Sequence, residues 1–321
     1  MNIKPIIVVA GEPNSIFLEI FFKSLKKIKV KKPLILISSY KLLNLQMKKL
    51  KFKKKIKILD KDNFLNYKIN NNYINLIDVN YNPTKAFENI SPKSNRYINN
   101  CFKIAFELIK KNNFKSLITG PISKKNFLNK KYLGITEYIS KEFDVKKNAM
   151  LIFNKKHSVC PLTTHLPIKF VSKKVSKKLI KEKVELIDNF YKTKFKIKPK
   201  IGILGLNPHC ESIDNFNEDE KIVKPAINFL KKFNYQVSGP HSADTIFLKD
   251  NIKNFDVIIG MYHDQVLSPM KTLFEYDAIN ITLGLPFIRI SPDHGPNEKM
   301  IGKNSSNPLS LIRAISFLDK H

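Results

Sequence analysis

The sequence predicts an α/β fold with doubly wound sheets. Short runs rich in isoleucine, leucine and valine alternate along the chain with longer segments whose apolar residues recur at helical spacing. Such alternation is typical of sheets that carry helices on both faces. The length of 321 residues suits two lobes of this kind better than one. No internal repeat or low-complexity linker divides the chain.

The N-terminal elements begin with a buried strand at 6–10. A turn, Gly11-Glu12-Pro13-Asn14, leads into a helix from Ser15 to Lys27, and Ser15 can cap its first turn. A strand, a glycine turn and a helix form a generic phosphate-binding layout, for which one glycine is weak evidence. Further strands are predicted at 34–38, 56–59, 73–79 and 116–118, and helices at 40–50 and 95–111.

The C-terminal half continues the alternation. The runs 150–154 and 158–162 predict a hairpin around Lys155-Lys156, and the amphipathic, lysine-rich segment 172–194 predicts a helix packed on a sheet. Further strands are predicted at 201–206, 256–261, 278–283 and 287–290, and helices at the segment opened by Thr136 and at 308–318.

Three histidines directly follow apolar runs that predict strands. His165 follows 158–162, His209 follows 201–206 and His263 follows 256–261. Open α/β sheets bind ligands at the carboxyl ends of their strands, so three imidazoles at that edge could hold a divalent metal and leave positions for a substrate. On the pattern alone, a turn residue or a hydrogen-bonded polar group is the more usual explanation of each histidine, and no local spacing such as H-x-x-x-H connects them.

The segment 261–295 is the most polar stretch to contain buried strands. Its polar residues lie at strand ends or in the loops between them; they are His263, Asp264, Lys271, Asn280, Arg289, Asp293 and His294. Arg289 is one of only three arginines among 57 basic residues. Just upstream, Asp244 is a candidate for orienting a histidine or relaying a proton, and a cap of the following segment is the alternative.

Composition excludes several classes of protein. The net charge of +30 comes from lysines spread over most amphipathic segments, whereas a nucleic-acid binder would mix arginine and aromatic residues along one stripe. We therefore expect no nucleic-acid partner, although a positive field favours anionic ligands. Three separated cysteines, Cys101, Cys160 and Cys210, imply no disulfide framework. The first apolar run is too short for a signal peptide or membrane span, so we expect no membrane association and a cytoplasmic location.

Seven motifs resemble, in the same order, those of the 4-hydroxythreonine-4-phosphate dehydrogenase family. They are Thr-Gly-Pro at 119–121, Thr-Thr-His-Leu-Pro at 163–167, Gly-Leu-Asn-Pro-His at 205–209, Ala-Asp-Thr at 243–245, Met-Tyr-His-Asp-Gln at 261–265, Asn-Ile-Thr-Leu-Gly-Leu-Pro-Phe-Ile-Arg at 280–289 and Asp-His-Gly at 293–295. The resemblance spans nearly the whole chain. It implies His165, His209 and His263 as metal ligands, and it implies Thr136, Lys271, Asn280 and Arg289 as substrate-binding residues.

The resemblance also implies a domain arrangement. It implies two doubly wound α/β/α lobes with a cleft between them, similar to the isocitrate and isopropylmalate dehydrogenases. Residues 1–125 with 270–321 are expected to form the terminal lobe, a candidate cofactor lobe. Residues 126–269 are expected to form a central lobe that carries the metal ligands and the dimer contacts. The implied assembly is a homodimer whose metal site is completed by histidines from both subunits.

The implied reaction is the oxidation and decarboxylation of 4-phosphooxy-L-threonine by NAD or NADP, in pyridoxal 5'-phosphate biosynthesis. Imidazole ligands favour one zinc or cobalt ion per site, whereas magnesium prefers oxygen and fits less well. No G-x-G-x-x-G follows a strand, so the cofactor candidates come from the loop 293–304, by analogy with related decarboxylating dehydrogenases: His294, Gly295 and Asn304. A metal-dependent lyase or hydrolase of a phosphorylated small molecule is the alternative.

Three departures from the family pattern affect substrate and cofactor contacts. Ile135 stands where the family usually has a histidine, and isoleucine cannot donate a hydrogen bond. The glycines that usually follow Gly11-Glu12-Pro13 are absent. The segment 296–304 replaces the usual Ala-Gly-Lys-Gly run.

Overall fold

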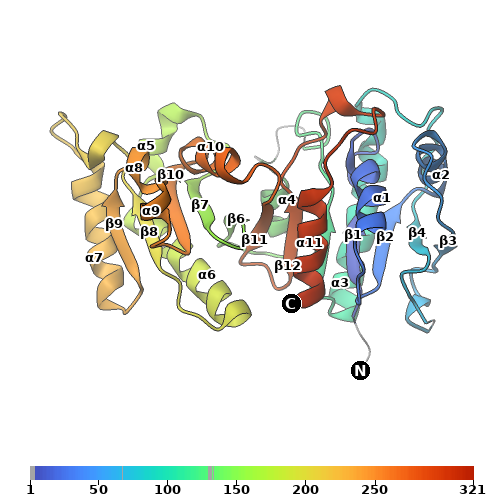
Figure 1. The fold of residues 1–321 in the computed structure, drawn as a ribbon, viewed down its shortest axis with the longest axis horizontal. Coiled ribbons are helices and arrows are strands. Elements are labelled where there is room, and N and C mark those ends of the chain that lie inside the picture. The colour runs from blue at the N-terminus through green and yellow to red at the C-terminus, as the bar shows by residue number, and fades with distance from the viewer. Residues whose placement is uncertain (1–3, 67, 129–131, 133) are drawn as a thin grey trace. The chain divides into compact units, whose positions relative to one another are not determined.

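The computed structural model describes residues 4–66, 68–128, 132 and 134–321. The chain forms two compact units, which we call the terminal unit (Met1–Ile139 with Pro286–His321) and the central unit (Ser140–Leu285) (Figure 1). The boundaries between the units, at 139/140 and 285/286, both lie later in the chain than the expected 125/126 and 269/270. The strand Ile279–Leu283 thus belongs to the central unit, because it pairs antiparallel with Ala149–Phe153, a distant partner that local patterning does not specify.

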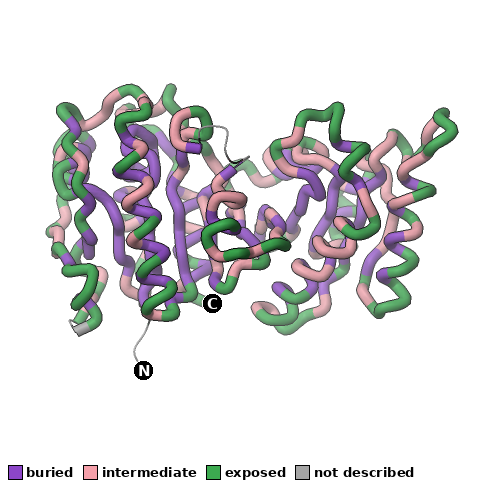
Figure 2. The backbone as a smooth tube through the Cα atoms, turned by 180° about the vertical axis from the view of Figure 1, so that it is seen from behind, coloured by how far each residue is buried: buried purple, intermediate pink, exposed green. Residues whose placement is uncertain are grey.

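The terminal unit is built on a parallel sheet. Its strands are β1 (Ile6–Val9), β2 (Leu34–Ser38), β3 (Ile56–Ile58), β4 (Ile74–Asp78), β5 (Ser116–Thr119) and β12 (Ile288–Pro292). They lie in the order β3-β4-β2-β1-β5-β12, and the pairings between these neighbours are parallel. The central strands are buried on both faces, as Figure 2 shows, which explains why they are apolar throughout instead of alternating.

Helices cover both faces of this sheet. They are α1 (Phe17–Lys27), α2 (Tyr40–Lys49), α3 (Asn95–Asn112), α4 (Ile135–Glu142, which runs into the central unit) and α11 (Leu309–Lys320). Helices α1 and α11 contact each other on one face, and α3 contacts β1 and β2 on the other (Figures 1 and 2). Phe17, Ile20 and Phe21 of α1 are buried, and burial of a side chain of this size contributes about 1.5–3 kcal/mol. Ser15 precedes α1 by two residues, and its hydroxyl oxygen accepts a hydrogen bond from the Phe17 amide.

The central unit is built on a mixed sheet. Its strands are β6 (Ala149–Phe153), β7 (Ser158–Thr163), β8 (Ile201–Leu204), β9 (Val237–His241), β10 (Val257–Tyr262) and β11 (Ile279–Leu283). They lie in the order β11-β6-β7-β10-β8-β9. The pairings β11–β6 and β6–β7 are antiparallel, which confirms the predicted hairpin, and the pairings from β7 to β9 are parallel.

The helices of the central unit include a predicted helix that is broken in two. They are α5 (Val171–Lys174), α6 (Lys177–Phe195), α7 (Lys224–Lys232), α8 (Ala243–Ile246), α9 (Lys249–Ile252) and α10 (His263–Phe274). The segment predicted as one helix at 172–194 is broken between α5 and α6. Ser176 is extended there, and its side chain accepts a hydrogen bond from the Leu179 amide, which caps a new helix. None of the helices in the described part of the chain is both long and apolar enough to cross a membrane.

Candidate functional site

The three predicted ligand histidines follow three neighbouring parallel strands. His165 lies just after β7, His263 is the first residue of α10 directly after β10, and His209 lies in the short turn Pro208–Cys210 after β8. The strand order β7-β10-β8 and its parallel register bring the three carboxyl ends to one edge of the central sheet. The strand pattern alone therefore places these histidines on the same side of the unit.

His165 and His263 form a pair. Their ring centroids are 5.6 Å apart with an interplanar angle of 37°. The Nδ1 of His263 lies 2.6 Å from Oδ1 of Asp264, and an ionised carboxylate can only accept, so Nδ1 carries the proton. This tautomer leaves the Nε2 lone pair available to a metal. The spacing and the tautomer both fit two imidazoles that share one zinc or cobalt ion.

His209 has different neighbours. Its Nδ1 lies 3.5 Å from Oγ of Ser242, and a hydrogen bond from Ser242 is the main cause of a lowered pKa at the exposed Asp244 carboxyl. Asp244, the predicted relay residue, is thus connected to His209 through Ser242. Across the described residues, no three His, Cys, Asp or Glu side chains converge closely enough to hold a metal. Among the described residues, His165 and His263 thus lie as a pair, and His209 does not join them.

The backbone around the histidines is strained. His165 (φ 50°), His209 (φ 54°) and Cys210 (φ 63°) all adopt the left-handed conformation, which costs a non-glycine residue on the order of 1 kcal/mol. Such strain persists only where surrounding contacts hold the loop in place.

The predicted substrate residues are divided between the two units. Thr136 in α4 and Arg289 in β12 belong to the terminal unit, whereas Lys271 in α10 and Asn280 in β11 belong to the central unit. The Oδ1 atom of Asn280 is buried and lacks a hydrogen-bond partner among the described residues. A bound ligand with a donor group would satisfy it.

Arg289 is the largest fully buried side chain of the described residues, at 1% exposure. Its Nε and Nη2 donate hydrogen bonds to Oγ1 of Thr119 at 3.0 and 2.6 Å. These bonds connect the Thr-Gly-Pro motif to the last residue of the 280–289 motif. Burial lowers the pKa of the guanidinium to about 10, and the negative charge of Glu137 acts in the opposite direction. Arg289 therefore keeps its positive charge at neutral pH.

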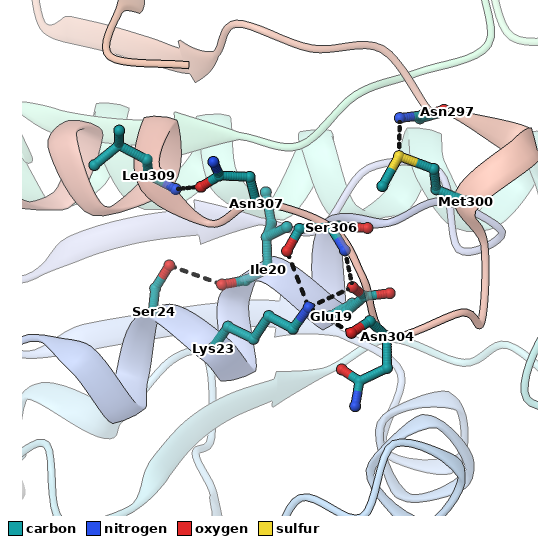
Figure 3. Close-up of polar contacts among 10 residues, drawn as sticks. All are labelled: Glu19, Ile20, Lys23, Ser24, Asn297, Met300, Asn304, Ser306, Asn307 and Leu309. Atoms are coloured by element: carbon teal, nitrogen blue, oxygen red, sulfur yellow. Dashed lines mark hydrogen bonds and ion pairs between the residues drawn. The ribbon is translucent and has the colours of Figure 1, made fainter. Parts of the chain in front are cut away.

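The candidate cofactor residues lie beside α1. The Nδ1 of His294 is 2.9 Å from the carbonyl oxygen of Gly295, and Pro296 accepts a hydrogen bond from the Ile16 amide. Lys23 donates to the carbonyl oxygen of Asn304 at 2.9 Å and to that of Ser306, as Figure 3 shows. These contacts hold both ends of the candidate loop against the helix that follows β1.

Glu12 is a buried carboxylate that the motif comparison did not single out. It is the third residue after β1, and its carboxylate accepts hydrogen bonds from the Asn14 amide and the Ser94 hydroxyl. Burial raises the pKa of this carboxyl, and the two hydrogen bonds only partly oppose the rise. In the sequence, the feature that could have indicated Glu12 is its position as the first charged residue after a fully apolar strand.

Replacing Glu12 with glutamine is expected to change how stability depends on pH. A carboxyl whose pKa is raised by folding binds its proton more tightly in the folded state, so its ionisation weakens folding as the pH rises above its ordinary pKa of 4.5. Glu12→Gln should therefore gain stability relative to the parent between acidic and neutral pH. Thermal unfolding measured across this range checks the result, with the exposed Glu107→Gln as control. A constant difference in melting temperature would contradict it.

The chain is similar to known proteins over most of its length. A family model described as pyridoxal phosphate biosynthetic protein PdxA matches residues 29–318. The 4-hydroxythreonine-4-phosphate dehydrogenase of Sulfurihydrogenibium sp. (strain YO3AOP1) is 41% identical over 246 residues, which cover 75% of this chain and 74% of the relative. The enzyme of the same name from Wigglesworthia glossinidia brevipalpis is 36% identical over 244 residues, with 75% and 73% covered.

Solved structures show the same fold. A putative 4-hydroxythreonine-4-phosphate dehydrogenase from Salmonella typhimurium superposes with a TM-score of 0.84 at 27% identity and covers 99% of both chains. The 4-hydroxythreonine-4-phosphate dehydrogenase from Klebsiella pneumoniae superposes with a TM-score of 0.83 at 26% identity, with 100% of this chain and 98% of the other covered. Because the family model covers residues 29–318, which is most of the chain, this protein belongs to the PdxA family of pyridoxal phosphate biosynthetic proteins.

Proposed function

We propose that the chain catalyses the NAD- or NADP-dependent oxidation and decarboxylation of 4-phosphooxy-L-threonine to 3-amino-2-oxopropyl phosphate and CO2. Curated relatives that are 33–41% identical are named 4-hydroxythreonine-4-phosphate dehydrogenases, and a dehydrogenase of this family implies a nicotinamide cofactor and a metal. The single observation that carries the proposal is the His165–His263 pair, whose rings lie 5.6 Å apart at adjacent strand ends.

We propose zinc or cobalt as the metal, held by His165, His209 and His263. When bound, the ion lowers the pKa of the substrate hydroxyl and stabilises negative charge that develops on its oxygen. Asp264 fixes the tautomer of His263 from the side opposite the ligand nitrogen. Ser242 lies between His209 and Asp244. Ser242 and Asp244 are therefore placed to hold a proton at Nδ1 of His209 or to accept that proton.

The substrate is doubly anionic, and this explains the proposed roles of the remaining side chains. The guanidinium of Arg289 and the ammonium of Lys271 supply the positive charge that a phosphate or a carboxylate requires. Asn280 offers a buried carbonyl oxygen to a donor on the substrate, and Thr136 offers a hydroxyl in the first turn of α4. Ile135 contributes no hydrogen bond, so more of the binding energy is assigned to the cationic residues. The loop 293–304 is proposed to contact the cofactor.

We further propose a homodimer in which the two subunits share the metal site. Large apolar side chains are exposed on the segments that follow the ligand histidines: Ile168 and Phe170 after His165, and Ile213 and Phe216 after His209. Ile213 is fully exposed and Ile168 is 67% exposed, so burial of these side chains against another surface would favour association. A second copy would cover them and bring additional histidines to the site.

Replacing Ile213 with aspartate is expected to produce a monomer that retains little metal. A symmetric dimer contains the residue twice, so the loss of about 2 kcal/mol at each copy weakens association by about a thousand-fold. Light scattering gives the mass and elemental analysis gives the metal content. Ile58→Asp, which alters an exposed isoleucine of the terminal unit, is the matched control and should remain a dimer. A dimeric Ile213→Asp with full metal content would contradict the proposed interface.

The reaction itself is tested with purified, zinc-loaded protein. We expect 4-phosphooxy-L-threonine to reduce NAD or NADP, measured by absorbance, with one CO2 released per nicotinamide reduced. Consumption of a phosphorylated substrate without nicotinamide reduction would indicate the lyase or hydrolase alternative. The preferred nicotinamide follows from the same assay, run with each cofactor in turn.

A further inference from the structure

Asp219 is a fully buried carboxylate next to the loop that carries His209. Its Oδ1 accepts a hydrogen bond from the Leu206 amide at 2.7 Å, and its Oδ2 accepts from the Asn207 amide at 2.9 Å and from the Asn207 side chain at 3.1 Å. A buried carboxylate is unfavourable unless donors of this kind satisfy it. The two backbone amides belong to Leu206 and Asn207, which precede His209 by three and two positions, so the carboxylate fixes the start of the His209 turn.

Glycine is required where this loop leaves β8. A Cβ added to Gly205 would lie 2.7 Å from the Cys210 sulfur and 3.2 Å from Oδ1 of Asp219. The absence of a side chain therefore lets the loop fold back onto its own carboxylate. The carbonyl oxygen of Gly205 accepts a hydrogen bond from a donor in α10, the helix that follows the neighbouring strand β10.

Gln265 provides that donor. It lies two residues after His263, in the first turn of α10, and its Nε2 donates to the Gly205 carbonyl oxygen at 2.8 Å. Its Oε1 accepts from the Met261 amide at 2.7 Å, and the Met261 carbonyl oxygen accepts from the Thr163 hydroxyl at 2.8 Å. One continuous set of hydrogen bonds thus connects the ends of β7, β10 and β8, the three strands that precede the ligand histidines.

We propose that Asp219 and Gln265 are positioning residues that hold the three histidine-bearing strand ends in the arrangement that a metal requires; this rests on the proposed function. The strained backbone of His165 and His209 is the independent sign that such contacts are needed, because left-handed residues relax when their surroundings loosen. Neither residue contacts the metal in this proposal. Each acts through the backbone that carries an imidazole.

The test is a titration of full-length, metal-free protein with Co²⁺, followed by its visible absorption without substrate or nicotinamide. Asp219→Asn places an amide donor against backbone amides, and Gln265→Met removes both hydrogen bonds at nearly constant volume. Each variant is expected to bind Co²⁺ about 10- to 100-fold more weakly, the usual effect of removing a group that orients metal ligands. Faster hydrogen exchange at 205–210 in metal-free Asp219→Asn is expected as a second readout.

Asp188→Asn is the matched control. Asp188 is a buried carboxylate of α6 in the same unit, and it pairs with Lys192 at 2.7 Å. It should lose stability while keeping the Co²⁺ affinity of the parent. Parental affinity in both Asp219→Asn and Gln265→Met would overturn the proposal and leave the proposed function standing. If Asp219→Asn fails to fold, Gln265→Met decides. A parent that binds no Co²⁺ would overturn the metal-dependent function itself.

Discussion

Replacing His263 with alanine is expected to lower turnover by at least about a thousand-fold and to remove most of the bound metal, while the fold remains intact. The substitution removes a proposed metal ligand, whose tautomer Asp264 fixes, and metal stabilisation of developing charge contributes several kcal/mol to catalysis. The side chain is 34% exposed at the start of α10, so its removal leaves little cavity. Elemental analysis, the nicotinamide assay and circular dichroism measure the three quantities.

His157→Ala is the control for this experiment. His157 lies in the same unit, and its Nδ1 is 3.1 Å from the Phe255 carbonyl oxygen, so the variant loses an imidazole that has no proposed part in the site. It should retain metal and turnover. His165→Ala and His209→Ala should resemble His263→Ala. A fully active His209→Ala would remove that residue from the site, and full metal content in His263→Ala would exclude it as a ligand.

Most of the fold could be predicted because local patterns report burial. The apolar run at β8 and the hairpin between β6 and β7 follow from composition and turn residues within a short window. Strand order does not, since the pairing of β11 with β6 joins segments more than a hundred residues apart. The break between α5 and α6 was missed because Ser176 suits a helix surface as well as a cap, and only the observed hydrogen bond distinguishes them.

The candidate site, like the fold, could be predicted only where local patterns determine it. Placing histidines after strands required only the order of elements, and the parallel register then brought them to one edge. The contacts that hold them came from side chains with no local signature. Asp219 was one of several acidic residues in a polar segment, and nothing in that segment distinguishes the carboxylate that turns inward toward the Leu206 amide. Hydrogen bonds across such distances depend on the assembled sheet.

Replacing Arg289 with methionine is expected to lower kcat/KM by about 10- to 10²-fold with little loss of stability. A charged hydrogen bond to a bound anion is worth about 1.5–3 kcal/mol, and burial strengthens it. Stability should change little, because the loss of the hydrogen bonds to Thr119 is offset by removal of the cost of burying a charge. Steady-state kinetics and thermal unfolding measure the two effects.

Two further variants separate the guanidinium from its charge. Arg289→Lys keeps a cation, but one ammonium cannot reproduce both the Nε and the Nη2 hydrogen bonds to Thr119, so it should recover only part of the lost kcat/KM. Arg96→Met removes an exposed arginine of α3 and should match the parent. The pKa of Arg289 is about 10, so at pH values below 10 loss of this charge should not lower kcat/KM. Parental kcat/KM in Arg289→Met would show that the buried cation has only a structural role in the terminal unit. The substrate anion would then have to be bound by Lys271.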